Sequence, residues 1–212
     1  MSRLRVINLG LPKTGTTTLS RALRRAGLHV ADWRIHDRQT KRDDIKGKLV
    51  GQIFYRDYFE TGDPLARLKE FDAVTEMNAL RPDNNFWPQT DFGLIDALER
   101  HHPGVRFVLS RRDPEATARS MMNWGNLGEK RLPDNDVPGL PRGFGGSVSD
   151  LMRWIEGHHA FCRRVFAGKG NFMEYDPADP EIRVKLGGFL GIEMPWWGRA
   201  NARRPAPERE AG

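Results

Sequence analysis

The segment Gly10–Thr18 carries the residue types that bind a phosphate group. It reads Gly-Leu-Pro-Lys-Thr-Gly-Thr-Thr-Thr, and it lies between an apolar run at 4–9 and a stretch of helical spacing at 16–26. Backbone N–H groups at such a turn and at the helix N-terminus can surround an anion. Lys13 would add a positive charge and Thr16–Thr18 would add hydroxyl donors. The segment therefore predicts a site for phosphate or a similar anion, the alternative being a plain strand–turn–helix connection with an exposed lysine.

This loop differs from the P-loop of nucleotide triphosphatases. That motif places its lysine directly after the second glycine. Here Thr16 follows Gly15, and Lys13 lies two residues before that glycine. The difference weakens an interpretation as a kinase or ATPase.

A second group of anion-binding side chains follows another apolar run, at 105–110. Arg111 and Arg112 come directly after it, and Ser120 lies eight residues beyond Arg112. A guanidinium at the end of a strand and a hydroxyl in the next helix can meet on one phosphate. The alternative is an arginine-rich turn on a solvated surface.

Both segments resemble the donor-binding motifs of sulfotransferases that use 3′-phosphoadenosine 5′-phosphosulfate (PAPS). Pro12-Lys-Thr-Gly-Thr-Thr17 matches the family's 5′-phosphosulfate loop, and the register of Asp113-Pro114 and Ser120 selects Arg112 over Arg111. The likeness spans roughly residues 3–196 and is greatest to the short bacterial, small-molecule type. It implies these donor-binding residues: Pro12, Lys13, Thr14, Gly15, Thr16, Thr17, Thr18, Arg112 and Ser120.

The resemblance implies an enzyme that transfers a sulfuryl group from PAPS to a hydroxyl or amine of an unidentified acceptor, without a metal. Lys13 would also stabilise the bridging oxygen of the donor. Family members carry a histidine base after a threonine at the end of a middle strand, and Glu76 occupies that place here, after Thr75. We therefore predict Glu76 as the general base, with His36 as the next candidate. An arginine-paired structural glutamate is the alternative.

Two other functions stay open from the sequence. One is a P-loop kinase-like phosphotransferase that uses ATP and magnesium, with Glu76 holding the metal. The other is a non-catalytic protein that binds nucleotides or nucleic acid. The chain has 34 Lys and Arg against 28 Asp and Glu, a net charge of +6, which favours an anionic partner. No interleaved aromatic and basic motif is visible, so nucleic acid is the less favoured partner.

The sequence marks the residues that would bind the acceptor less clearly than those that would bind the donor. Phe86-Trp-Pro88 and Trp124, with a long loop at Gly125–Gly146, could form an aromatic pocket for a small molecule or a glycan, or could simply anchor loops. The basic segment 34–48 could attract an anionic acceptor or be a solvated face. The segment Pro195–Arg204 could replace the family's adenine-covering segment.

Strands that alternate with helices predict an α/β fold: one three-layer domain with a central parallel sheet flanked by helices. The resemblance implies that this domain is of the P-loop-containing nucleotide-binding type. We expect this domain over residues 1–198 and a basic, flexible tail at 199–212. Predicted strands lie at 4–9, 29–31, 71–76, 105–110 and 171–174. Predicted helices lie at 16–26, 49–60, 64–70, 91–100, 114–123, 147–166 and 181–190.

The cysteine and histidine content and the absence of long apolar runs exclude several kinds of site and of protein. The single cysteine, Cys162, excludes an internal disulfide and a cysteine-based zinc site, and we expect it in the core. Of His158 and His159, in the middle of a predicted helix, we expect one to be solvated. No apolar run approaches the roughly 20 residues of a membrane-spanning helix, and no signal peptide is visible, so we expect a cytoplasmic protein.

Overall fold

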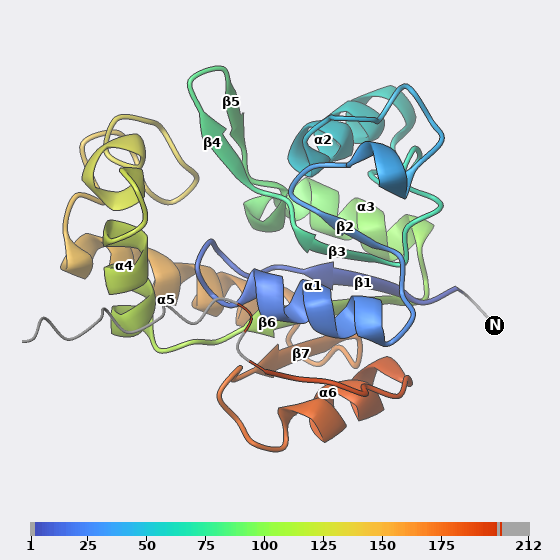
Figure 1. Ribbon diagram of the computed structural model, residues 1–212. Coiled ribbons are helices and arrows are strands. Elements are labelled where there is room, and N and C mark those ends of the chain that lie inside the picture. Colours follow the sequence, from blue (N-terminus) through green and yellow to red (C-terminus); the bar gives the residue numbers. More distant parts are fainter. Residues whose placement is uncertain (1–2, 199, 201–212) are drawn as a thin grey trace, which may run out of the picture.

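The chain folds around a five-stranded parallel sheet. The computed structural model describes residues 3–198 and residue 200. The strand order is β2-β3-β1-β6-β7, and every neighbouring pair runs parallel. Figure 1 shows the sheet near the centre of the molecule, with helices on both sides. The strands are β1 (Arg5–Asn8), β2 (Val30–Asp32), β3 (Ala73–Glu76), β6 (Val105–Ser110) and β7 (Phe172–Tyr175).

Alternate residues of the strands pack into two separate layers. In β1, Val6 belongs to the cluster under α1 and α6, whereas Ile7 belongs to the cluster under α2, α3 and α5. This alternation is the period of a strand whose two faces are both buried. The predicted three-layer α/β fold is therefore confirmed. The helices are α1 (Thr16–Arg25), α2 (Val50–Thr61), α3 (Phe92–His101), α4 (Pro114–Met122), α5 (Val148–Val165) and α6 (Ile182–Leu190).

Three helices begin at a capping side chain. Asp91 accepts hydrogen bonds from two backbone N–H groups of α3, Asp113 from one of α4, and Ser147 from one of α5. Such caps satisfy N–H groups that have no partner in the first helical turn. Asp113 matters for the site, because it starts α4 directly after Arg112.

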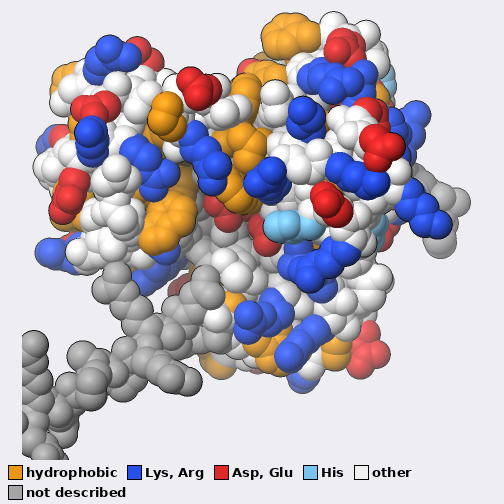
Figure 2. Space-filling view, turned by 45° about the horizontal axis from the view of Figure 1, so that its top comes forward, with side chains coloured by type: hydrophobic (Ala, Val, Ile, Leu, Met, Phe, Trp, Pro, Cys, Tyr) orange, Lys and Arg blue, Asp and Glu red, His pale blue; other side chains and the backbone are white. Residues whose placement is uncertain are grey.

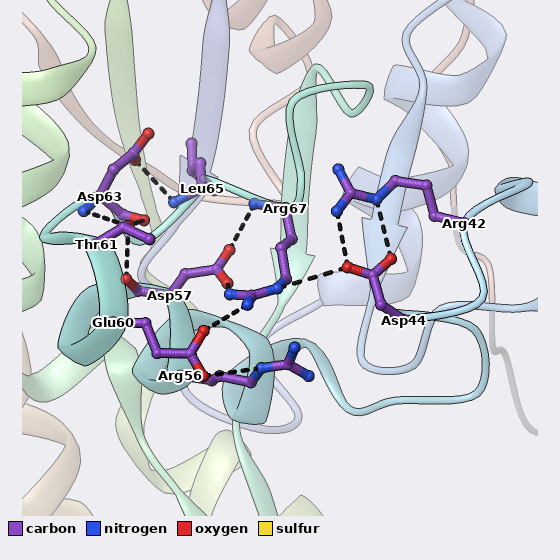
Figure 3. Close-up of polar contacts among 9 residues, drawn as sticks. All are labelled: Arg42, Asp44, Arg56, Asp57, Glu60, Thr61, Asp63, Leu65 and Arg67. Carbon is purple, nitrogen blue, oxygen red and sulfur yellow. Dashed lines mark hydrogen bonds and ion pairs between the residues drawn. The ribbon is translucent and has the colours of Figure 1, made fainter.

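The predicted helix at 64–70 is wrong. The chain forms turns there, because side chains compete for the backbone. The Asp63 carboxylate accepts the N–H of Leu65 at 2.9 Å, and the buried Asp57 carboxylate accepts the N–H of Arg67 at 2.7 Å. Figure 3 shows the Arg67 guanidinium between the carboxylates of Asp57, Glu60 and Asp44.

A hairpin and three short helical turns lie outside the predictions. An antiparallel hairpin, β4 (Ala79–Arg81) and β5 (Asn84–Phe86), follows β3 and projects away from the main sheet (Figure 1). The predicted loop at 125–146 contains a π-helical turn at Leu127–Arg131 (η3), and single 3₁₀ turns occur at Asp37–Gln39 (η1) and Pro88–Thr90 (η2).

The burial of Cys162, His158 and His159 tests what the sequence predicts for these side chains. Cys162 is in the core, as predicted. His158 and His159 are both buried, so the prediction that one is solvated is wrong. The predicted tail at 199–212 falls outside the described residues, except for Ala200. Within the described ranges, no helix combines the length and apolar character that crossing a membrane requires.

Candidate active site

A cleft of about 1020 Å³ lies at the carboxyl ends of the central strands. After β1 the chain forms β2 and β3 on one side of it and then β6 and β7 on the other, and ligands of open α/β sheets bind at such a switch point. All the site residues predicted from the sequence line this one cleft: Pro12, Lys13, Thr14, Gly15, Thr16, Thr17, Thr18, Glu76, Arg112 and Ser120. The structure thus brings together segments that are more than a hundred residues apart.

The loop between β1 and α1 has an unusual backbone. Lys13 has a φ of 70° and Gly15 a φ of 101°, both in the left-handed region that favours glycine. The Ser110 hydroxyl, at the end of β6, donates to the carbonyl of Thr14, whose own hydroxyl donates to the carbonyl of Leu11 at 2.7 Å. These two hydrogen bonds engage the carbonyl groups of Thr14 and Leu11 with protein hydroxyls. Within the described part of the chain, the backbone N–H groups of Thr14, Gly15 and Thr16 have no acceptor. These amides can therefore bind an anion, and we call the segment Gly10–Thr18 the anion loop.

Asn8, which the sequence analysis did not single out, fixes the position of this loop. Its side-chain amide donates to the carbonyl of Thr75 at 2.8 Å, and its side-chain oxygen accepts the N–H of Gly10 at 3.1 Å. One buried side chain thus joins the end of β1 to the end of β3. It sets the separation between the anion loop and Glu76. The available signal was a polar residue inside an apolar run, directly before the loop.

Glu76 lies at the end of β3, partly buried and next to the loop. Its Oε2 accepts a hydrogen bond from the Thr16 hydroxyl at 2.9 Å. Burial, and then the charge of Asp32, raise the pKa of Glu76 to about 7, against the smaller opposing effects of Thr16 and Lys13. A carboxylate with a pKa near the working pH suits a general base.

Arg112 enters the cleft, and Arg111 is not among the residues that line it. The Arg112 guanidinium donates to the carbonyl of Lys13 at 3.3 Å, so it lies directly against the anion loop. The backbone N–H of Arg111 donates instead to the carbonyl of Tyr175 at 2.7 Å, extending the contact between β6 and β7. Ser120 reaches the cleft from α4. His36 is exposed before η1, outside the cleft lining, which makes it a poor second candidate for the base.

Aromatic side chains line two sides of the cleft. The Lys13 Nζ lies 4.7 Å from the ring centroid of Trp124. On the other side, Trp196 and Trp197 lie over α1 and β7. The Trp197 Nε1 donates to the carbonyl of Pro177 at 3.0 Å, and the Arg25 guanidinium lies 4.6 Å from the ring of Trp196.

The expected aromatic pocket around Phe86-Trp-Pro88 does not form part of the cleft. Trp87 is buried, its Nε1 donates to Asn85 at 2.6 Å, and its ring packs edge-on against Trp154 at 5.5 Å. It anchors the hairpin to α5. A separate cavity of about 580 Å³ lies between α5 and the chain around Phe144. Of the three aromatic residues predicted for the acceptor pocket, Trp124 lines the cleft and Phe86 and Trp87 do not.

A family model described as "Sulfotransferase domain" matches residues 5–135, which is more than half of the chain. The match includes the anion loop, Glu76, Arg112 and Ser120. No curated protein matches the chain. Since the matched region covers more than half of the chain and contains most of the sheet, the chain belongs to the sulfotransferase domain family.

Proposed function

We propose that this sulfotransferase takes its sulfuryl group from PAPS. The proposal is carried by one observation: a single cleft presents two separate anion-binding groups. The loop amides and Lys13 form one group, and Arg112 with Ser120 forms the other. PAPS has two anionic ends, a 5′-phosphosulfate and a 3′-phosphate, and each needs its own set of donors.

In this proposal Lys13 and Glu76 serve the chemical step. The acceptor oxygen attacks the sulfur, a new oxygen–sulfur bond forms, and the bond between the sulfur and the bridging phosphate oxygen breaks. The electron pair of that bond stays on the phosphate, where the Lys13 ammonium stabilises it. The proton of the acceptor hydroxyl passes to the Glu76 carboxylate and later to water. The products are a sulfated acceptor and adenosine 3′,5′-bisphosphate.

We assign the adenine side of the donor to the segment around Trp196 and Trp197. Both rings line the cleft beyond the anion loop, and the backbone N–H of Ala200 donates to the Thr18 hydroxyl at 3.3 Å. The segment therefore lies against the start of α1. A flat indole surface can stack on a purine ring, and an arginine close behind it adds positive charge.

One contact supports the alternative of a phosphotransferase. The Thr16 hydroxyl and the Glu76 carboxylate are 2.9 Å apart, and such a pair can hold magnesium beside a nucleotide. Against it stand the position of Lys13 in the loop and the pair Arg112 and Ser120, which would have no phosphate to bind in ATP.

Calorimetric titration separates these functions. We expect adenosine 3′,5′-bisphosphate to bind in the presence of a chelator, because protein cations and amides supply the neutralising charge. ATP should bind more weakly, with or without magnesium. Tighter binding of ATP with magnesium would favour the phosphotransferase. Binding of the bisphosphate without any release of it from PAPS, across a panel of phenols and sugars, would favour a non-catalytic nucleotide-binding protein.

A further inference from the structure

Two pairs of arginine and tryptophan lie beyond the donor-binding residues. The guanidinium carbon of Arg81, in the hairpin, lies 4.5 Å from the ring centroid of Trp33. The guanidinium carbon of Arg131, in η3, lies 5.4 Å from the ring centroid of Trp124, the ring that also contacts Lys13. These four residues come from four separate segments of the chain, so the fold itself assembles them. None of them belongs to the predicted donor site.

Backbone strain marks the same edge of the sheet. In the described part of the chain, the non-glycine residues with positive φ are Lys13, at 70°, and Trp33, at 56°. Trp33 directly follows β2, and its N–H donates to the backbone carbonyl of Glu76 at 2.8 Å. Such conformations persist only where the surroundings hold them, and they gather at functional sites. Trp33 is thus fixed beside the proposed base, as Lys13 is fixed beside the proposed sulfuryl group.

The two arginines lack acidic partners. Among the described residues, neither Arg81 nor Arg131 forms an ion pair with a carboxylate. Arg131 donates to the carbonyl of Leu80 at 3.1 Å, while its buried Nε has no hydrogen-bond partner. Leu80 directly precedes Arg81, so this hydrogen bond places Arg131 beside the residue that carries the second guanidinium. Burial, and then the charge of Arg81, lower the pKa of Arg131. Figure 2 shows Lys and Arg side chains beside hydrophobic ones in the saddle between the two upper lobes. Such an arrangement is stabilised when an anion binds between the guanidinium groups.

We propose that the acceptor is a hydroxylated ring compound that carries an anionic group of its own, a carboxylate or a sulfonate-type group. Arg81 and Arg131 bind the anionic oxygens, Trp33 and Trp124 contact the ring, and the hydroxyl is directed toward Glu76. The inference rests on the proposed function, because it assumes that the sulfuryl group lies beside Lys13. It assigns the wall beside the cleft, formed by Arg81, Arg131 and Trp33 and joined to the cleft lining by Trp124, to selection of the acceptor. We call this wall the acceptor half of the site.

The test measures binding of three small probes to the protein saturated with adenosine 3′,5′-bisphosphate. The probes are para-hydroxybenzoate, para-hydroxybenzenesulfonate and the uncharged para-cresol. We expect at least one anion to bind about tenfold more tightly than the cresol, the usual scale of a charge-assisted hydrogen bond. Arg81→Gln should remove this preference and leave the affinity for the bisphosphate and the cresol unchanged. Arg81→Lys should keep part of it.

Arg142→Gln is the control, because Arg142 is an exposed arginine in the 125–146 region that also contains Arg131. Its Nε lies 3.8 Å from a carboxylate oxygen of Asp136. It should leave all three affinities unchanged. Equal affinities for anions and cresol, an unaltered preference in Arg81→Gln, or the same loss in Arg142→Gln would each overturn the inference. So would failure of every probe to bind while the bisphosphate binds, and the proposed function would then still stand. Failure of the bisphosphate itself would overturn both. Whichever anion binds more tightly identifies the class of anionic group.

Discussion

The two halves of the proposed site, the donor half in the cleft and the acceptor half beside it, are built from different materials. The donor half consists mainly of backbone: a short loop between β1 and α1, held by Ser110, Asn8 and the carbonyl contact of Arg112. The acceptor half consists of long side chains from the end of β2, the hairpin and η3. A site built from backbone depends on the fold, whereas a site built from side chains can change without it. Substitutions in the donor half should therefore affect every acceptor equally, and substitutions in the acceptor half should change which acceptor is used.

The largest effect is expected at Glu76, where the two halves meet. Glu76→Gln keeps the shape and hydrogen bonding of the side chain but removes the base, so turnover should fall by roughly 10²–10⁴-fold with any acceptor. Donor affinity should barely change. Glu70→Gln is the control, because Glu70 also accepts a hydrogen bond from a threonine, Thr40, but lies outside the cleft. Turnover is measured as the steady-state rate of both variants, with an acceptor found in a panel of phenols and sugars. Near-normal turnover in Glu76→Gln would remove Glu76 from catalysis.

Lys13→Ala should give the next largest effect. Charge develops on the bridging oxygen only as the bond to sulfur breaks, so Lys13 contributes more to the transition state than to bound product. We expect kcat to fall by roughly 10²–10³-fold, as when a donor to a developing oxyanion is removed. The affinity for adenosine 3′,5′-bisphosphate should fall much less. Equal losses in the two measurements would make Lys13 an ordinary binding lysine.

Arg112→Ala tests the second anion group within the donor half. It should weaken adenosine 3′,5′-bisphosphate by about 1.5–3 kcal/mol, the value of a charged hydrogen bond, and adenosine 5′-monophosphate much less. Ser120→Ala should show the same selectivity more mildly. Arg111→Ala is the matched control in calorimetric titrations. A selective loss in Arg111→Ala instead would place the 3′-phosphate one residue earlier.

The pH dependence should follow the pKa of Glu76, which is about 7. A base must be ionised to accept a proton, so kcat/KM should rise about tenfold between about pH 6 and pH 8. Every acceptor that has no titrating group in this range should give the same midpoint, because the base is shared. A profile that is flat across this range would contradict the assignment of Glu76 as the base.

A smaller effect of Glu76→Gln should appear in the thermal stability of the protein. The folded pKa of Glu76 is raised from 4.5 to about 7, so its favourable contribution is complete below about pH 4.5 and is lost as the pH rises through 7. Glu76→Gln should therefore raise the Tm relative to the unchanged protein above pH 7, by a few degrees, and give no such gain at about pH 4.5. Thermal unfolding at the two pH values measures this. A gain that does not depend on pH would show that ionisation of Glu76 is not its cause.

The two halves also differ in what the sequence could predict. The main sheet and the donor half follow from local patterns, because apolar runs, a glycine-containing loop and the residues after a strand lie within short windows. The turns at 64–70 escaped prediction, because a buried ion pair between Asp57 and Arg67 overrides helical propensity. The acceptor half escaped it too. Arg81 and Arg131 are ordinary arginines until the hairpin and η3 bring them near each other, and no local window contains both.

The hairpin supplies Arg81 without contributing a strand to the five-stranded sheet. For protein engineering this makes it a replaceable part. Residues 81–84, beyond the buried Ala79 and Leu80, could be exchanged for loops of other lengths and charges while the sheet, the anion loop and the base keep their mutual positions. A library restricted to this hairpin and to 124–131 would thus search acceptor preference directly, and its members would share one donor and one chemistry.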